Sequence, residues 1–372
     1  MLDPSIVFLN HGSFGATPRA VFEAYQKWQR ELERQPVEFL GRRFNDLMRD
    51  ARAALADYLH TDKSNLTYVT NATVGVNIVA RSLKLSTGDE VLSTDHEYGA
   101  MDRTWRFVCQ KTGARYINQR LPRPLESREQ LIEALWSAVT DRTRAIFLSH
   151  ITAPTALIFP IEEICQRARA AGILTVIDGA HAPGQITLDL EHIGADFYVG
   201  NCHKWMLSPK GAGFLYARPD AQALLEPLVV SWGWESETPG DSPFIDQHEW
   251  QGTRDIAAFL SVPAAIEFMR AHAWDRVRAE CHALAREFRQ RMTELTGLPP
   301  LSPDSPDWYA QMVALPLPDC DRNALKRRLY DDYHIEIPLQ MWNGSSLSRA
   351  SFQGYNTRED VDKAMEAFRA LL

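Results

Sequence analysis

The chain has few of the features that mark secreted, metal-binding or membrane proteins. Its five cysteines are scattered and odd in number, with no pair at metal-ligand spacing, which favours a reducing cytoplasm and no metal site. The first residues lack the basic start and the apolar run of a signal peptide, so we do not expect export. The most apolar stretch, residues 256–269, is interrupted by Pro263 and Glu267 and is shorter than the ~20 residues of a membrane span. We therefore expect a cytoplasmic protein with no membrane partner.

An excess of positive charge is also absent. The chain carries 40 basic and 48 acidic residues, well interspersed, for a net charge of −8. Nucleic acids and anionic membranes require a one-sided basic surface. We therefore expect a small-molecule partner and no nucleic acid. The chain also lacks a Gly-x-Gly-x-x-Gly turn after its first regular strand, which argues against a Rossmann-type nucleotide enzyme.

What the sequence does contain is a regular alternation of strands and helices. Seven apolar runs of strand length are separated by helical stretches: residues 66–70, 90–94, 115–118, 145–149, 173–177, 197–199 and 213–217. This alternation predicts an α/β fold, with a three-layer, doubly wound, mainly parallel seven-stranded sheet in a large domain. With 372 residues, the chain is long enough for about two domains.

The segments on either side of the alternating region differ from it. A strand at 6–9 and a turn at 10–15 precede a helical run to Leu59 that is broken near Pro36. The later segments are one long helical region, a Pro-rich loop, two strands and a final helix capped by Thr357, at 257–295, 298–306, 311–314, 335–337 and 357–371. They predict a smaller C-terminal α+β domain. We expect three parts: an N-terminal segment over the active site (1–20), the large domain (21–252) and the small domain (253–372).

Two of the predicted strands end in residues that can carry out chemistry. Asp178 follows the strand at 173–177, and Lys204 comes shortly after the strand at 197–199. Ligands of parallel α/β sheets bind outside the carboxyl ends of the strands, so both side chains should face one crevice. Lys204 alone would most simply be a surface lysine. Together with a carboxylate it suggests pyridoxal phosphate, whose aldehyde forms a Schiff base with lysine and whose pyridine nitrogen is held protonated by the acid.

A phosphate group needs hydrogen-bond donors at the start of a helix, and residues 70–77 provide them between a strand and an apolar helical face. We expect Ala72 and Thr73 to hold the phosphate. Threonine and asparagine are also favoured at helix starts for structural reasons alone.

Several blocks of the chain, taken in order, resemble one family. The chain is similar to fold type I pyridoxal-phosphate enzymes of the class V aminotransferase group, and within that group to isopenicillin N epimerase-like proteins. The resemblance covers essentially the whole chain and is carried by Asp178 with His181, His203 with Lys204, Gly252 with Thr253, and the blocks Phe8–Gly15, Pro36–Arg43, Val229–Trp234, Glu249–Asp255 and Ser348–Asn356.

The resemblance implies roles for the cofactor-binding residues. Lys204 is the Schiff-base lysine and the base at Cα, Asp178 pairs with the pyridine nitrogen, and His181 contacts the phenolic oxygen. Asn201 and His203 are further phosphate donors, and Thr253 reaches the phosphate across a dimer interface. The protein is then a homodimer with shared active sites.

The resemblance also implies substrate contacts. Tyr98 stacks on the cofactor, with His96 as the alternative. Arg349 binds the α-carboxylate of an amino-acid substrate, since a planar guanidinium can donate two parallel hydrogen bonds. Asn10 and His11 belong to a turn that closes over the substrate. Trp232 and Trp234 lie in a loop that shapes it.

The chain departs from related cysteine desulfurases in two places. Residues 335–348 contain no cysteine, which disfavours persulfide chemistry, and residues 152–155 read Thr-Ala-Pro-Thr where those enzymes have an asparagine.

The resemblance implies an enzyme that removes the Cα proton to give a quinonoid, and it favours epimerisation or racemisation. The alternatives are a C–S lyase acting by β-elimination, a class V aminotransferase, or a catalytically silent binding module that retains the fold. Isopenicillin N itself need not be the substrate.

Overall fold

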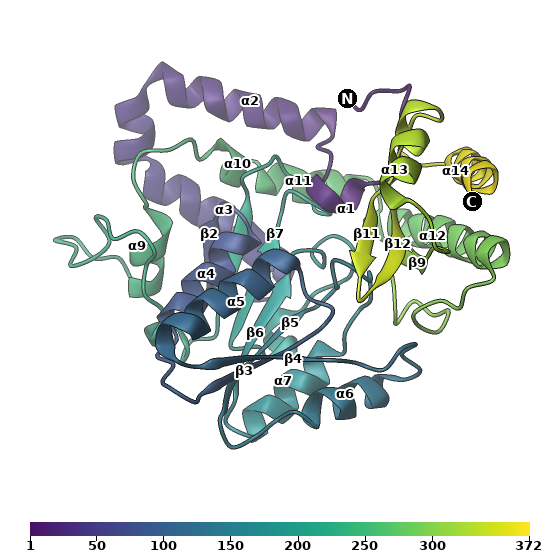
Figure 1. The fold of residues 1–372 in the computed structure, drawn as a ribbon. Helices are drawn as coiled ribbons and strands as arrows, with labels where there is room; N and C mark the ends of the chain where they lie inside the picture. Colours follow the sequence, from purple (N-terminus) through teal and green to yellow (C-terminus); the bar gives the residue numbers. More distant parts are fainter.

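The computed structural model describes residues 1–372. Its largest feature is a seven-stranded sheet (Figure 1). The strands are β2 (Leu66–Val69), β3 (Glu90–Thr94), β4 (Arg115–Gln119), β5 (Thr143–Ser149), β6 (Leu174–Gly179), β7 (Phe197–Asn201) and β8 (Gly213–Ala217). Their order is β2-β8-β7-β6-β5-β3-β4; β8 is antiparallel to both of its neighbours and the other pairs are parallel. The predicted mainly parallel seven-stranded sheet is confirmed.

Both faces of the sheet are apolar because successive side chains of a strand point to opposite sides. In β5, Ala145 and Phe147 join one apolar core, while Ile146 and Leu148 join a second core on the other face. The first core includes α4 (Ala72–Ser82) and α5 (Gly99–Thr112), and the second includes α3 (Phe44–Leu59), α6 (Arg128–Trp136) and α7 (Ile161–Ala170). Figure 1 shows α4 with α5 on one side of the sheet and α6 with α7 on the other. The three-layer prediction is confirmed.

The N-terminal helices are interrupted as expected near Pro36. Helix α2 (Arg19–Arg34) ends just before this proline, and a single π-helical turn (Glu38–Arg42) leads into α3. The remaining short elements of the large domain are α8 (Leu190–Ile193), α9 (Pro243–Glu249) and 3₁₀ turns at Lys63–Asn65 and Gln222–Leu224.

The expected single helical region after residue 256 is three helices. They are α10 (Ala257–Leu260), α11 (Val262–Ala271) and α12 (Trp274–Thr296). Pro263 cannot donate the hydrogen bond that would continue α10, and Ala273 is left-handed with φ 49°. Helices α10 and α11 pack against α2 and α3. The domain limits at residues 20 and 252 stay predictions. None of the helices has both the length and the apolar character needed to cross a membrane.

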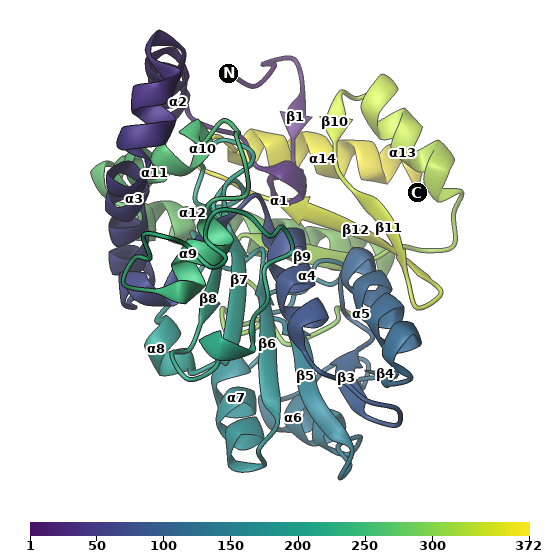
Figure 2. The ribbon, with the colours of Figure 1, turned by 90° about the vertical axis from the view of Figure 1, so that its left-hand side faces the viewer.

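The smaller C-terminal domain is α+β, as predicted. Its sheet has the antiparallel order β11-β12-β9, formed by β9 (Met312–Pro316), β11 (Leu339–Trp342) and β12 (Ser345–Ser351). Helices α12, α13 (Arg322–Asp331) and α14 (Arg358–Leu371) lie around it (Figure 2). Thr357 caps α14 in a capping box with Asp360, as its sequence predicts.

The β11–β12 hairpin was not predicted. Its turn residues, Asn343 and Gly344, have φ 47° and 78°, the two positive values that a type I′ turn requires. The N-terminal strand β1 (Val7–Phe8) was predicted, and it pairs in parallel with β10 (Ile335–Glu336) beside the small domain (Figure 2). This pairing carries the following helix α1 (His11–Phe14) to the boundary between the two parts of the molecule.

Candidate active site

A cavity of about 750 Å³ lies at the carboxyl ends of β3, β5, β6 and β7 and is closed on the other side by α1 and the β11–β12 hairpin. Most of the predicted site residues line it: Ala72, Thr73, Tyr98, Asp178, His181, Asn201, His203, Lys204 and Arg349. Side chains far apart in the sequence therefore meet in one place, as expected for strand ends of a parallel sheet.

Lys204 lies in the turn after β7 and is half-buried. Its Nζ is 3.1 Å from Nε2 of His181. Burial lowers the pKa of Lys204 to about 8; the charge of Arg349 lowers it further and that of Asp178 opposes the change. A lysine with such a pKa has a much larger neutral, nucleophilic fraction close to neutral pH than an ordinary lysine.

Asp178 ends β6 and is paired in register with Ser149 of β5 and Val199 of β7. Its Oδ1 accepts a hydrogen bond from the backbone N–H of Ala180 at 2.9 Å. Burial raises the pKa of Asp178, and the positive charge of Lys204 counteracts the rise. The carboxyl group thus lies deep in the cavity, where it can bind a protonated ring nitrogen.

The start of α4 offers donors for an anion. Asn71 caps the helix by accepting the N–H of Val74 at 3.0 Å, and Oδ1 of Asn201 accepts the N–H of Ala72 at 2.8 Å. The backbone N–H of Thr73 has no acceptor within the chain, and its side chain is exposed at the cavity. The free donors at this helix start are therefore Thr73 and the Asn201 amide, whereas the N–H of Ala72 is already bound.

His203 can donate to an anion only in its charged form. Its Nδ1 lies 2.9 Å from the carbonyl oxygen of Ala212, and a carbonyl only accepts, so Nδ1 carries the proton. Burial lowers the pKa of His203 to about 4. A bound phosphate would have to raise that pKa for Nε2 to donate as well.

Arg349, from β12, is buried and only partly satisfied. It donates from Nη1 to the carbonyl oxygen of Ala153 and from Nη2 to Oγ of Ser13 at 3.3 Å. Its Nε is buried with no partner. Burial lowers the pKa of Arg349 to about 10. An unpaired N–H of this kind is costly unless a ligand completes it, and a carboxylate is the matching group.

The amino-terminal turn packs against the segment that carries the lysine. Gly12, Ser13 and Phe14 line the cavity, whereas His11 and Asn10 lie behind them. His11 is fully buried, with Nε2 at 3.1 Å from the carbonyl oxygen of Lys204. Burial lowers the pKa of His11 to about 3. Substrate contacts by Asn10 and His11 stay predictions.

Gly15 explains how close this turn comes to the lysine. Its φ is +71°, and a Cβ at this position would lie 2.0 Å from the carbonyl oxygen of His203. Only glycine allows this approach, so Gly15 holds α1 against the segment that carries Lys204.

The two aromatic candidates differ in placement. Tyr98 lines the cavity and is 51% exposed. His96 is buried outside the cavity lining, with Nδ1 at 2.7 Å from Oγ1 of Thr155 and its ring against Trp342. Thr155 also bonds to Thr152, so the Thr152–Thr155 segment supports His96 and presents Ala153 and Pro154 to the cavity.

Several cavity residues escaped the sequence analysis. Glu97 is buried; both its oxygens accept hydrogen bonds, from Thr94 at 2.8 Å and from the N–H and hydroxyl of Ser149 at 2.9 and 2.6 Å. Burial raises the pKa of Glu97 to about 8. The sequence feature that could have identified Glu97 is its place at the end of a predicted strand, next to Tyr98. The hairpin residues 340–343 also line the cavity, and the Asn343-Gly344 pair was their signal.

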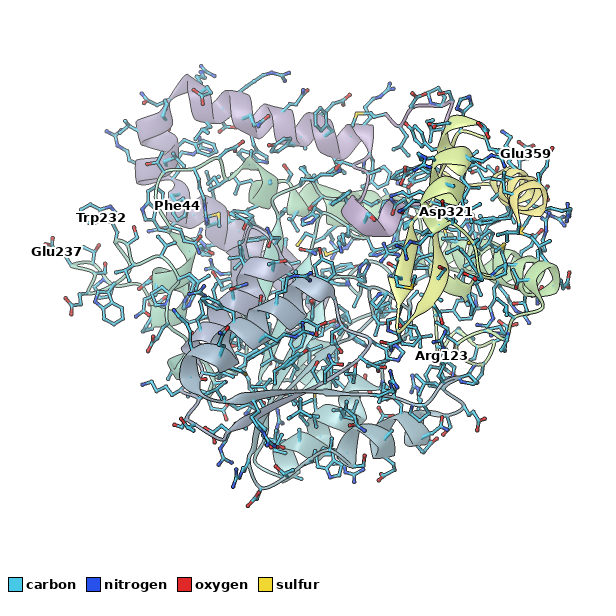
Figure 3. The ribbon with its side chains drawn as sticks, in the orientation of Figure 1. Phe44, Arg123, Trp232, Glu237, Asp321 and Glu359 are labelled. Atoms are coloured by element: carbon cyan, nitrogen blue, oxygen red, sulfur yellow. The ribbon has the colours of Figure 1, made fainter.

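Three predicted residues of this chain do not line the cavity: Thr253, Trp232 and Trp234. Thr253 is exposed. Trp232 is 83% exposed, borders a separate hollow with Phe44 and Trp250, and is seen in Figure 3 on the side of the molecule away from the small domain. Trp234 is also exposed. No group of three or more His, Cys, Asp or Glu side chains is arranged to hold a metal ion.

The fold, with a half-buried lysine and a buried carboxylate at the ends of neighbouring strands, is that of one enzyme class. The family described as "Aminotransferase class-V" matches residues 7–364, and the chain belongs to this family.

Individual proteins and solved structures are similar to this chain over nearly its whole length. The chain is 38% identical over 382 residues to isopenicillin N epimerase of Streptomyces clavuligerus, covering 100% of this chain and 96% of that protein. It is 29% identical to a putative L-cysteine desulfhydrase of Oryza sativa subsp. japonica, covering 100% and 84%. Among solved structures, a C-DES mutant with glycine covalently linked to the PLP cofactor superimposes with a TM-score of 0.86 at 20% identity, covering 99% and 97%. The predicted family and fold are confirmed.

Proposed function

We propose that this protein is a pyridoxal 5'-phosphate-dependent enzyme that acts at Cα of an amino acid or an amino-acid-derived substrate, as an epimerase or racemase. One observation carries the proposal: a half-buried lysine with a lowered pKa, a buried aspartate and an incompletely paired arginine line a single cavity. The 38% identity to an isopenicillin N epimerase supports the choice of reaction.

The residues present fit the cofactor. Lys204 would bind its aldehyde and Asp178 its pyridine nitrogen, while His181 would face its phenolic oxygen. Thr73, Asn201 and charged His203 would hold the phosphate, together with Thr253 of a second subunit. Ala72, whose N–H is bound to Asn201, would lie against the phosphate at the start of α4, and Tyr98 would cover the ring. When bound, the group supplies an electron sink for the negative charge left at Cα after proton removal.

The chain's own residues orient the substrate and move its proton. Arg349 lines the cavity and holds the α-carboxylate, which directs Cα toward the lysine. Lys204, as a neutral amine, accepts the Cα proton. Asn10 and His11 support the turn whose residues Gly12, Ser13 and Phe14 limit the entry of water. Tyr98 lines the same cavity from the start of α5 and returns a proton to Cα, which inverts the centre if it acts from the side away from Lys204.

β-Elimination from a sulfur-containing amino acid is the second candidate, because a relative is a putative L-cysteine desulfhydrase. No cysteine lines the cavity, so persulfide transfer to the protein has no acceptor there, but elimination needs none. Transamination uses the same groups. A silent binding module would be expected to have lost Lys204 or Asp178, and it would purify without the yellow colour of the cofactor.

We also infer a homodimer with shared sites, located in the cytoplasm. Thr253 is exposed, and the neighbouring loop exposes Val230 and Trp232, large apolar side chains of the kind that a partner subunit covers. All five cysteines are unpaired, which is usual in a reducing compartment. The net charge of −8 supports a small-molecule partner rather than nucleic acid.

The reaction is tested by NMR of the cofactor-loaded protein with L-amino acids and cysteine conjugates in heavy water. Deuterated substrate of mixed chirality is the expected result. Keto acid with ammonia and a thiol would establish the lyase instead, and keto acid with aminated cofactor would establish the transaminase. Absence of Cα exchange with every substrate would contradict the proposal.

A further inference from the structure

We propose that Trp205 is a positioning residue that fixes the tautomer of His181, so that the imidazole presents an Nε2–H group to Lys204 and to the cofactor. This inference rests on the proposed function only for the cofactor; the tautomer itself follows from the chain's own contacts.

Both nitrogens of the His181 ring are engaged. Nε1 of the Trp205 indole donates to Nδ1 of His181 at 3.3 Å, and Nε2 lies 3.1 Å from Nζ of Lys204. Trp205 is completely buried and His181 nearly so. Neither side chain can therefore exchange its partner for bulk water without a rearrangement of the site.

The two contacts permit one arrangement of protons. An indole N–H is only a donor, so Nδ1 of His181 must be a bare acceptor. A neutral imidazole then carries its proton on Nε2, and when Lys204 is a neutral amine Nε2–H is the donor and that amine the acceptor. The charged imidazole is excluded because it has no lone pair for Trp205. Burial, followed by the charges of Lys204, Arg349 and His11, holds the pKa of His181 well below its usual value.

The Trp205 contact does not depend on the state of Lys204. When Lys204 is joined to the cofactor, Nδ1 of His181 still accepts from the indole, and Nε2–H is free for the phenolic oxygen. Without the indole N–H, the other tautomer becomes accessible and would turn a lone pair toward that oxygen. The indole itself is held by the His11 ring, with centroids 5.0 Å apart, so the amino-terminal turn also supports this arrangement.

Neutron diffraction from deuterated crystals of the cofactor-loaded protein tests the tautomer directly. We expect a deuteron on Nε2 of His181, none on Nδ1, and the Trp205 deuteron directed at Nδ1. A deuteron on Nδ1 would overturn the inference. The position of this deuteron does not depend on the reaction. If the deuteron is on Nε2 but the protein shows no Cα exchange, the proposed function is contradicted and the tautomer assignment is retained.

The variant Trp205→Phe tests the consequence, with Trp105→Phe as a matched control. Trp105 is an equally buried tryptophan whose indole N–H has no partner and which packs on Phe147 of the sheet. The readout is the pH titration of visible absorbance, which reports the pKa of the lysine–cofactor imine. Loss of a donor to the phenolic oxygen leaves that oxygen more negative, so the midpoint should rise by about one pH unit in Trp205→Phe.

Trp105→Phe should titrate like the wild type. A Trp205→Phe midpoint equal to that of the wild type, or an equal shift in both variants, would contradict the role of the indole N–H. If Trp205→Phe does not fold, the neutron result decides alone.

Discussion

Burial is the first cause of the pKa shifts at the individual residues of the cavity. It lowers the pKa of Lys204 and Arg349 and raises the pKa of Asp178 and Glu97. In each case the charged form loses water that the protein replaces only in part. The cavity therefore contains charged groups that an anionic, amine-bearing ligand can complete.

The first prediction concerns the effect of Lys204 on the free energy of unfolding. The pKa of Lys204 in the folded chain, about 8, lies below its ordinary value of 10.5. Between these values the unfolded state binds more protons, so the unfolding free energy rises with pH. Cofactor-free Lys204→Met should be more stable than the cofactor-free wild type below about pH 8, by an amount on the order of 3 kcal/mol, and the gap should shrink toward pH 10.5. Urea unfolding of both proteins across this range measures it; a gap that does not change with pH would refute the shift.

The second prediction concerns substrate binding by Arg349. Lysine at this position keeps the charge but cannot keep the contacts to Ala153 and Ser13 while also binding a carboxylate in a planar fork. Arg349→Lys should lower kcat/KM roughly 10- to 150-fold, a loss of about 1.5–3 kcal/mol of transition-state stabilisation. Cofactor binding should be retained. Steady-state kinetics with an absorbance titration of the cofactor separates the two effects. Unchanged kcat/KM would remove Arg349 from substrate binding.

At the scale of elements, the seven strands of the large sheet were predictable and the β11–β12 hairpin was not. Six strands of the large sheet are largely buried runs between turn residues, and only the edge strand β4 consists of exposed and half-buried residues. Strand β11 instead places Gln340 and the exposed Met341 between its two buried ends, which resembles a loop in the sequence. The division between α11 and α12 falls at Ala273, whose left-handed backbone has no sequence signal because alanine rarely adopts it.

In the site as well, some residues could be predicted from the sequence and others could not. Asp178 and Lys204 could be placed because each follows a buried strand, and the carboxyl ends of such strands converge. The hairpin residues could not, because their position depends on how the small domain packs against the large one. Glu97 was missed although it follows a predicted strand, because its burial depends on contacts to Thr94 and to Ser149 of another strand. Ser13 and Phe14 reach the cavity only because β1 pairs with β10.

A buried ion pair between two helices gives the third prediction. Arg52 of α3 is hydrogen-bonded to Glu249 at the end of α9 and donates to the carbonyl oxygen of Lys63 at 3.1 Å. Arg52→Met leaves the Glu249 carboxylate buried without its cation, and stability should fall by about 3–5 kcal/mol. The double variant Arg52→Met/Glu249→Gln should recover much of this loss in urea unfolding. Equal stability of Arg52→Met and wild type would show that the pair is not a structural link.

In the whole molecule, the cavity is built by the large domain, the small domain and the amino-terminal segment, and Thr253 is exposed outside it. If Thr253 acts across the interface, heterodimers of Lys204→Ala with Thr253→Ala protomers contain one intact site. They should be active although both parent homodimers are impaired. Tandem-tagged heterodimers of verified composition measure this, and activity no higher than that of Thr253→Ala alone would place Thr253 in its own subunit's site.

The central claim is that Lys204 carries the cofactor. Borohydride reduction of the cofactor-loaded protein, followed by peptide mass mapping, tests it most directly. We expect a reduced pyridoxyl group on Lys204, unchanged in Lys210→Ala and absent from Lys204→Ala. An adduct on the neighbouring Lys210, or no adduct on a protein saturated with cofactor, would contradict it.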